Sequence, residues 1–233
     1  MPTLIARIMK MRGLSQQCSK AYVQSVLGLQ SERAREILLA STRLLYENFD
    51  DLLKQYPPDE VLHALLALER QIAQLTTLAL ATPTQQGVLP VVEVADALLM
   101  AASDAVRAYE TLAGAPMPRL MQVACSQRAV SQRFARAAFV RAAGRETALT
   151  HEQLMDTRAT FPLGLQTMAG AGTTSALIGF ELGQARSLWD ACEVALEAAP
   201  REQALYMLAD NSEQVLGVMD NLTSLYQRAA RPA

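Results

Sequence analysis

The chain has 233 residues, of which 51% are hydrophobic, 5% aromatic and 19% charged, and its formal net charge is −2. This composition supplies enough apolar material for a sizeable core in one or two domains. The near-neutral charge argues against a nucleic-acid partner, because binding phosphates needs a basic face. No apolar run approaches the roughly 18 residues that cross a bilayer, so we expect no membrane span.

The first residues do not have the pattern of a secretory signal. Arg7, Lys10 and Arg12 fall where the apolar centre of a signal peptide would lie. We therefore expect either a cytoplasmic protein or a periplasmic one in which Met1 stands in place of a removed export signal.

Four helices are predicted in the first half of the chain. Apolar residues recur at helical spacing over residues 3–28, and a second helix follows an N-cap at Ser31 and ends before Pro57. Further helices are predicted over residues 59–80 and 88–113, and the loop between them is rich in helix-breaking residues. The Gly-Ala-Pro-Met-Pro stretch that follows marks the middle of the chain.

The second half repeats this organisation. A fifth helix is predicted over residues 119–143, and Thr150 with Gln153 resembles a capping box that opens a sixth. Pro162 falls inside the sixth helix and is expected to kink it, while the seventh contains Trp189, the only tryptophan. The eighth has apolar residues at alternating spacings of three and four, which is typical of bundle packing. Because no segment alternates with a period of two, we predict an all-α fold of two tandem antiparallel four-helix bundles, about eight helices in all.

A ten-residue motif occurs twice and divides the chain. Residues 12–21 and 128–137 share an arginine, a serine, a glutamine and a closing alanine when aligned at an offset of 116 residues. They also share an aliphatic third position and a basic ninth position, Lys20 in one copy and Arg136 in the other. Self-similarity at one fixed offset indicates a duplicated structural unit. We therefore predict two helical repeats, residues 1–115 and 116–233.

Each copy of the motif places three hydrogen-bonding residues on one helix face. Its arginine, serine and glutamine stand at positions i, i+3 and i+4, beside the apolar stripe of the same helix. A guanidinium partly withdrawn from water favours a planar anion or a carboxylate. The alternative is an ordinary arginine that pairs with a glutamate of a neighbouring helix. The candidate ligand-binding residues are Arg12, Ser15, Gln16, Arg128, Ser131 and Gln132.

Nothing in the sequence favours catalysis or a cofactor. Two histidines are too few for most metal sites, and no nucleophile triad, phosphate loop or dinucleotide fingerprint is present. The three cysteines, Cys18, Cys125 and Cys192, have no C-x-x-C spacing, so we expect free, mostly buried thiols. A bridge between Cys18 and Cys125 is the alternative if the two motif helices pack together.

The two motifs resemble the first helix of a known sensor module. NarX-type nitrate/nitrite sensor kinases and PilJ-type type IV pilus chemotaxis transducers share an N-terminal module with a pattern close to A-G-R-Q-R-M-L-S-Q-R-M-A-K. Residues 11–16 with Lys20 are loosely similar to it, and Ala124, residues 127–133 and residues 135–136 are more similar. The ending of the chain, including residues 211–220, resembles that of free-standing members with two copies.

This resemblance implies a four-helix bundle for each copy and often an exported protein. In the nitrate sensors, small anions bind between the first-helix arginines of two subunits. The resemblance therefore implies that Arg12 and Arg128 face one another across a pseudo-twofold axis, with nitrate or nitrite between them and with Ser15 and Ser131 nearby.

Two functions from different classes follow. The first is a soluble, non-enzymatic sensor for a small oxyanion that signals through a protein partner, and it predicts that Arg12 and Arg128 converge on one partly dry pocket. The second is a helical interaction scaffold, related to type IV pilus and chemotaxis signalling, with no small-molecule ligand. It predicts separated arginines, each paired within its own bundle, and a contiguous apolar surface. The sequence leaves the oligomeric state open.

Overall fold

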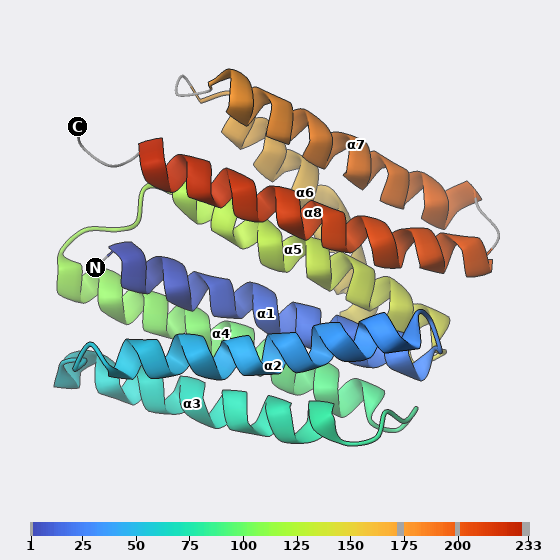
Figure 1. Cartoon of the computed structure of the whole chain (residues 1–233), viewed down its shortest axis with the longest axis horizontal. Coiled ribbons are helices and arrows are strands. Elements are labelled where there is room, and N and C mark those ends of the chain that lie inside the picture. The colour runs from blue at the N-terminus through green and yellow to red at the C-terminus, as the bar shows by residue number, and fades with distance from the viewer. Residues whose placement is uncertain (1, 172–174, 199–200, 230–233) are drawn as a thin grey trace.

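The computed structural model describes residues 2–171, 175–198 and 201–229, and these ranges hold eight α-helices and no strand (Figure 1). The predicted all-α fold is thereby confirmed. In the described residues, no helix combines the length and apolar character that crossing a membrane requires. The helices are α1 (Pro2–Val26), α2 (Ser31–Leu53), α3 (Asp59–Leu80), α4 (Val88–Ala113), α5 (Arg119–Ala142), α6 (Ala148–Ala169), α7 (Ala176–Ala198) and α8 (Arg201–Ala229).

Two predicted helix starts differ from the structure by a few residues. Ser31 is the first residue of α2 and not its N-cap, which is Gln30 in a left-handed conformation with φ of 45°. The capping box of α6 is formed by Thr147 and Thr150, one turn earlier than predicted. Gln153 is therefore free to use its side chain elsewhere. Pro162 lies inside α6, which continues through it to Ala169.

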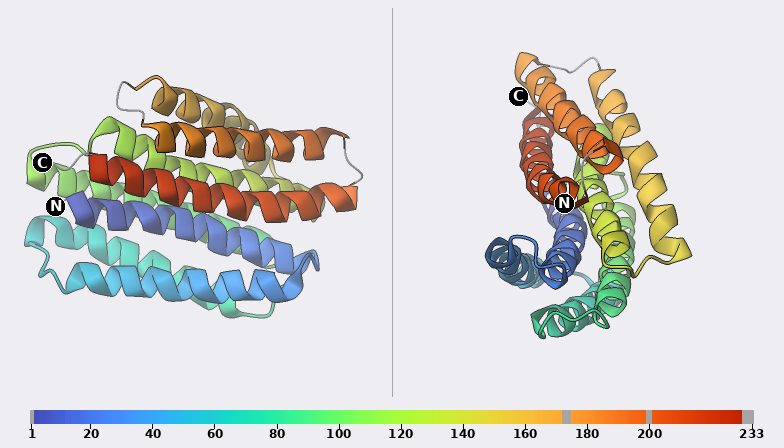
Figure 2. Two further views of the ribbon diagram at one scale, coloured as in Figure 1. Left: turned by 45° about the horizontal axis from the view of Figure 1, so that its top comes forward. Right: turned by 90° about the vertical axis from the view of Figure 1, so that its right-hand side faces the viewer.

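Successive helices run in opposite directions, and the two halves have the same contacts (Figure 1). In the first half α1 packs on α2 and α4 while α3 packs on α4; in the second half α5 packs on α6 and α8 while α7 packs on α8. The extensive contact between halves joins α1 to α5, which run in the same direction at the centre of the molecule (Figure 2). We call this contact the α1–α5 seam.

The seam brings the two copies of the repeated motif face to face. A Cβ atom added to Gly13 would lie 3.4 Å from the Cβ of Arg128, so the residue after Arg12 touches Arg128 across the seam. A glycine permits this close approach of two helices because it has no side chain. The motif is therefore the contact between the halves.

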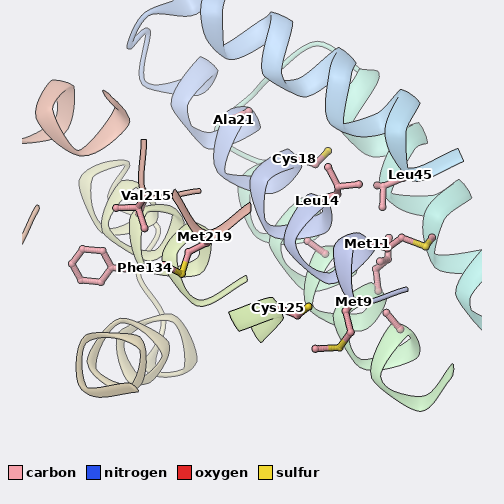
Figure 3. Close-up of a cluster of buried hydrophobic side chains, with 14 of the residues drawn as sticks. Met9, Met11, Leu14, Cys18, Ala21, Leu45, Cys125, Phe134, Val215 and Met219 are labelled. Carbon is pink, nitrogen blue, oxygen red and sulfur yellow. The ribbon is translucent and has the colours of Figure 1, made fainter. Parts of the chain in front are cut away.

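One apolar core continues through both halves (Figure 3). Leu14 and Cys18 of α1, Phe134 of α5 and Met219 of α8 are buried together with the other members of the cluster. Burial of each large side chain contributes about 1.5–3 kcal/mol, so this core supplies the main driving force for joining the halves. Cys18, Cys125 and Cys192 are buried and free, as the sequence indicated.

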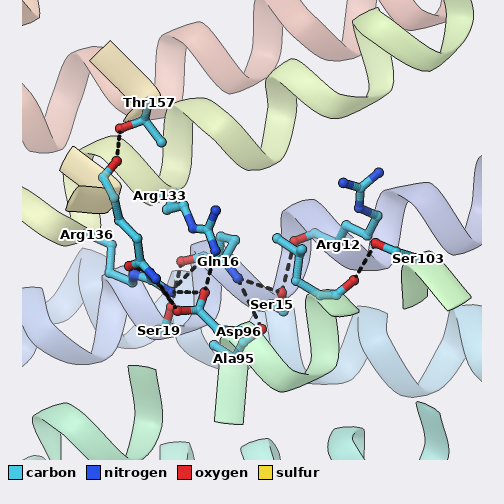
Figure 4. Close-up of polar contacts among 12 residues, drawn as sticks. Arg12, Ser15, Gln16, Ser19, Ala95, Asp96, Ser103, Arg133, Arg136 and Thr157 are labelled. Atoms are coloured by element: carbon cyan, nitrogen blue, oxygen red, sulfur yellow. Dashed lines mark hydrogen bonds and ion pairs between the residues drawn. The ribbon is translucent and has the colours of Figure 1, made fainter. Parts of the chain in front are cut away.

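The basic ninth position of each motif forms an ion pair with the opposite half. Arg136 of α5 is fully buried and its Nη1 and Nη2 lie 2.9 and 3.2 Å from the carboxylate oxygens of Asp96 on α4 (Figure 4). Arg136 also donates to Gln153 Oε1 at 2.6 Å. Lys20 of α1 reciprocates by donating to Ser212 Oγ at 2.9 Å and pairing with Glu213 on α8. The last helix of each half is thus tied to the first helix of the other.

Candidate functional site

Both serines of the predicted site are buried inside their own helices. Ser15 Oγ donates to the carbonyl of Arg12 at 2.9 Å, and Ser131 Oγ donates to the carbonyl of Arg128 at 3.0 Å. The two side chains are exposed by 0% and 2%. These serines cap backbone groups within the first helices and do not face either of the pockets described below.

Both glutamines of the predicted site link neighbouring helices. Gln16 Nε2 donates to the carbonyl of Ala95 at 3.1 Å, and Gln132 Nε2 donates to the carbonyl of Ser212 at 2.8 Å. Gln16 Oε1 also accepts from Arg136 at 2.5 Å. The two glutamines therefore fix α4 against α1 and α8 against α5, which is a structural task.

The two arginines do not share a pocket. Arg128 Nε forms an ion pair with Asp220 Oδ1 at 2.5 Å, at one side of a pocket of about 410 Å³ that we call the Arg128 pocket. Burial raises the pKa of Asp220, and the positive charges of Arg128 and Lys10 partly oppose this effect. The Arg128 pocket is lined by Ala6, Arg7, Lys10, Asn48, Arg128, Asp220, Thr223, Ser224 and Gln227.

Arg12 lines a second pocket, of about 380 Å³, which we call the Arg12 pocket. The two pockets have no residue in common. Positions 12 and 128, 48 and 164, and 10 and 126 are each 116 residues apart, so the pockets are equivalent under the internal repeat. The Arg12 pocket is lined by Arg12, Arg119, Gln122, Val123, Ser126, Gln127, Thr160, Leu163, Gly164 and Thr167.

The Arg12 guanidinium has no carboxylate partner among the described residues. Its Nη1 donates to Met9 Sδ at 3.1 Å, and its Nε is buried without a hydrogen-bond partner. The side chain points away from the network around Asp96 (Figure 4). Burial lowers the pKa of Arg12, and the charge of Arg133 adds to this effect. A partly buried cation without a counter-ion is costly, because desolvation disfavours the charged form.

Gln127, which lines the same pocket, contains a second unsatisfied group. The residue is 3% exposed, and its Oε1 is buried without a hydrogen-bond partner in the described part of the chain. A buried unpaired polar group of this kind costs about 1–3 kcal/mol. The amide fits only because residue 164 is glycine: a Cβ at Gly164 would lie 1.8 Å from Gln127 Nε2. The residue of the Arg128 pocket that is equivalent to Gly164 is Asn48.

The sequence did not single out Gln127 or Gly164 as site residues. Gln127 directly precedes the second motif arginine, but its equivalent in the first repeat is Met11, so a search for shared positions passes over it. Gly164 belongs to the Phe-Pro-Leu-Gly stretch that has no counterpart in the first half. The lack of a counterpart in the first half was the one feature of the sequence that could have pointed to Gly164.

The lining of the Arg12 pocket is rich in hydrogen-bond donors. Two guanidinium groups and the hydroxyl of Ser126 can donate to a ligand, whereas the hydroxyls of Thr160 and Thr167 donate to Asp156 and to the carbonyl of Leu163. Its lining, as described, has no histidine or acidic residue to act as a general base. A donor-rich lining of net positive charge is chemically suited to an anion.

No family model, curated protein or solved structure matches this chain.

Proposed function

We propose that the chain is a non-enzymatic binding module for a small oxyanion and that the anion sits in the Arg12 pocket. The observation that carries the proposal is the partly buried Arg12 guanidinium, which has no carboxylate partner among the described residues. An oxyanion would supply that partner through planar, charge-assisted hydrogen bonds. Arg119 and the hydroxyl of Ser126 would bind its remaining oxygens.

Nitrate and nitrite are the inorganic anions that the sensor-module resemblance implies. Both are planar and carry their charge on oxygen, which suits paired hydrogen bonds from the N–H groups along the edge of a guanidinium. Because Arg12 and Arg128 line different pockets, we place the ligand at Arg12 and not between the two arginines. Arg128 already has Asp220 as its counter-ion.

The proposed signal passes to a protein partner. α6 carries Thr160 and Leu163 on the pocket wall, and Phe161 between them stacks on Trp189 of α7 with ring centroids 4.2 Å apart. A ligand that draws α6 toward Arg12 would therefore shift α7. Leu177 and Phe180 on α7 are 53% and 60% exposed, which gives a partner an apolar surface to read.

Thermal unfolding in the presence of anions tests the proposal. Nitrate, nitrite, chloride, sulfate and phosphate are compared at matched ionic strength, since screening alone changes surface electrostatics. A specific anion at a hundredfold excess over its dissociation constant stabilises the fold by about 2.7 kcal/mol. We expect a selective shift with an oxyanion, and we expect Arg12→Ala to lose it while remaining folded.

The second candidate function is the helical interaction scaffold. Its supporting observation is the ion pair of Arg128 with Asp220, which shows one motif arginine in a structural role. If no anion stabilises the wild-type protein selectively, and if Arg12→Ala and Arg128→Ala both fold normally, the oxyanion proposal fails. The interaction scaffold is then the better explanation.

A further inference from the structure

We propose that the Arg128 pocket binds a free α-amino acid, with the carboxylate of the ligand on Arg128 and Lys10 and its ammonium group on Asp220. This inference concerns the other pocket and does not depend on the oxyanion proposed at Arg12. Three features of the Arg128 pocket lead to it: unpaired groups of both charges, their close spacing and the polarity of the remaining lining.

Two cations of the pocket have terminal nitrogens that lack partners. Arg128 is 6% exposed and contacts Asp220 through Nε, and neither of its Nη atoms forms a hydrogen bond with the described residues. Lys10 likewise has no hydrogen bond or ion pair with the described part of the chain. Arg7, the third cation of the lining, already pairs with Asp51 on α2. Arg128 and Lys10 are therefore the cations that can bind an anionic group.

Asp220 brings the opposite charge to the same pocket. Its side chain is 48% exposed, and its carboxylate accepts no hydrogen bond from the described residues, although one oxygen lies beside Arg128 Nε. A carboxylate can accept several hydrogen bonds, and an ammonium group offers three N–H donors with a positive charge. A primary ammonium group therefore suits Asp220, whereas a simple anion is repelled by it.

The two kinds of charge are adjacent in the pocket. Arg128 Nε lies 2.5 Å from Asp220 Oδ1, so the groups that bind these two side chains must also be adjacent in the ligand. An α-amino acid has its carboxylate and its ammonium group on one carbon atom. A simple carboxylate would satisfy the cations and leave Asp220 without a donor.

The remaining lining indicates a small or polar ligand side chain. The pocket volume of about 410 Å³ falls in the range of roughly 300–1,000 Å³ that is usual for small organic ligands. Ala6 is the one apolar residue among the described residues that line it. Thr223 and Ser224 already donate their hydroxyls to carbonyls of α8 at 2.8 and 3.0 Å, so recognition depends on the charged groups.

Calorimetric titration of the full-length protein with L-alanine, propanoate and ethylamine tests the inference, because the last two each lack one charged group of alanine. We expect alanine to bind at least about tenfold more tightly than either, since each missing group removes charge-assisted hydrogen bonds. γ-Aminobutyrate has the same two charges further apart and should also bind more weakly than alanine. Equal affinity for alanine and propanoate, or no binding of alanine, would overturn the inference.

Substitutions locate the site. Asp220→Asn should remove the preference for alanine over propanoate, and Arg128→Gln should weaken alanine binding by at least about tenfold. Arg12→Gln is the matched control, because it changes the equivalent arginine of the other pocket and should leave alanine binding unchanged. Alanine binding that is lost in Arg12→Gln, or that is kept in Arg128→Gln, would overturn the inference. Circular dichroism and thermal unfolding establish that each variant is folded, and nitrate is titrated separately so that the two proposals can fail independently.

Discussion

The Arg12 and Arg128 pockets occupy equivalent places in the two halves, yet their arginines are in different electrostatic states. Arg128 has a carboxylate, Asp220, within 2.5 Å, whereas Arg12 contacts a methionine sulfur and has no carboxylate partner among the described residues. The repeat therefore preserved the position of the arginine and not its partner. A repeated residue can have a counter-ion in one copy and lack one in the other.

The partner helices explain the difference. Gln16 bonds the carbonyl of Ala95 and Gln132 bonds that of Ser212, so α4 and α8 correspond at an offset of 117 residues. At this offset Asp220 corresponds to Ser103. Ser103 carries no charge, and its Oγ donates to its own helix at the carbonyl of Leu99. One acid-to-serine difference thus leaves Arg12 without a counter-ion.

The largest predicted effect comes from removing the buried ion pair between Asp96 of α4 and Arg136 of α5, which joins the two halves. Asp96→Ala leaves fully buried Arg136 without its carboxylate, and removing one partner of a buried pair costs about 3–5 kcal/mol. Urea unfolding should show this loss. Asp104→Ala is the matched control on the same helix, because its pair with Arg107 is exposed and should contribute at most about 0.5 kcal/mol. Equal losses of unfolding free energy in both variants would contradict a special role for the Asp96–Arg136 pair.

The next prediction concerns a substitution that gives the Arg12 pocket a carboxylate like the one in the Arg128 pocket. Ser103→Asp supplies the missing carboxylate, which should pair with Arg12 and compete with any bound anion. We expect the affinity for nitrate, measured by calorimetry, to fall by at least about tenfold. Ser103→Asn is the control of similar size without charge. Unchanged binding in Ser103→Asp would show that the lack of a counter-ion is not what selects the anion.

The reciprocal change opens the Arg128 pocket. Asp220→Ser removes the counter-ion of Arg128 while Arg7 and Lys10 remain in the lining. We expect a second, weaker anion site, seen as a rise in calorimetric stoichiometry from one to two. It is weaker because Gln127 and Gly164 have no equivalents there, their positions being Met11 and Asn48. A stoichiometry that stays at one would limit the comparison to the Arg12 side.

The smallest predicted effect is a difference in pH dependence between two aspartates. Burial raises the pKa of Asp96, but Arg136 and its hydrogen bonds outweigh this and hold the pKa below the ordinary 3.8, so its stabilisation is lost as pH falls through the folded pKa. Burial leaves the pKa of Asp220 above 3.8, so the stability it affects falls as pH rises from 3.8 through the raised pKa.

Urea unfolding from about pH 2 to about pH 7 measures both dependences. The unfolding free energy of the wild type minus that of Asp96→Asn should rise with pH. The unfolding free energy of the wild type minus that of Asp220→Asn should fall with pH. Slopes of the same sign for the two variants would contradict these opposite shifts.

Helical periodicity in the sequence was sufficient to predict the all-α fold, but the repeated motif did not predict the roles of its shared residues. Helical periodicity follows from local spacing, so the eight helices could be found within a few residues of their ends. Lys20 and Arg136 were visible as a common basic position, yet their pairing with the opposite half depends on which helices meet at the seam.

The pocket itself lay beyond sequence reasoning for a physical reason. The amide of Gln127 fits only because Gly164, 37 residues later, leaves space for it, and Arg12 has no counter-ion on α4 because Ser103 stands where α8 has Asp220. Both facts depend on three-dimensional packing. Conversely Gln16 and Gln132, which the motif favoured as ligands, donate their amide N–H groups to carbonyls of neighbouring helices.

Titration calorimetry of nitrate against the wild-type protein, Arg12→Ala and Arg128→Ala tests most directly whether the anion binds at Arg12 and not at Arg128. We expect one anion site in the wild type, the same site with similar affinity in Arg128→Ala, and no binding in Arg12→Ala. Binding that survives Arg12→Ala, or that is lost in Arg128→Ala while that variant stays folded, would contradict it.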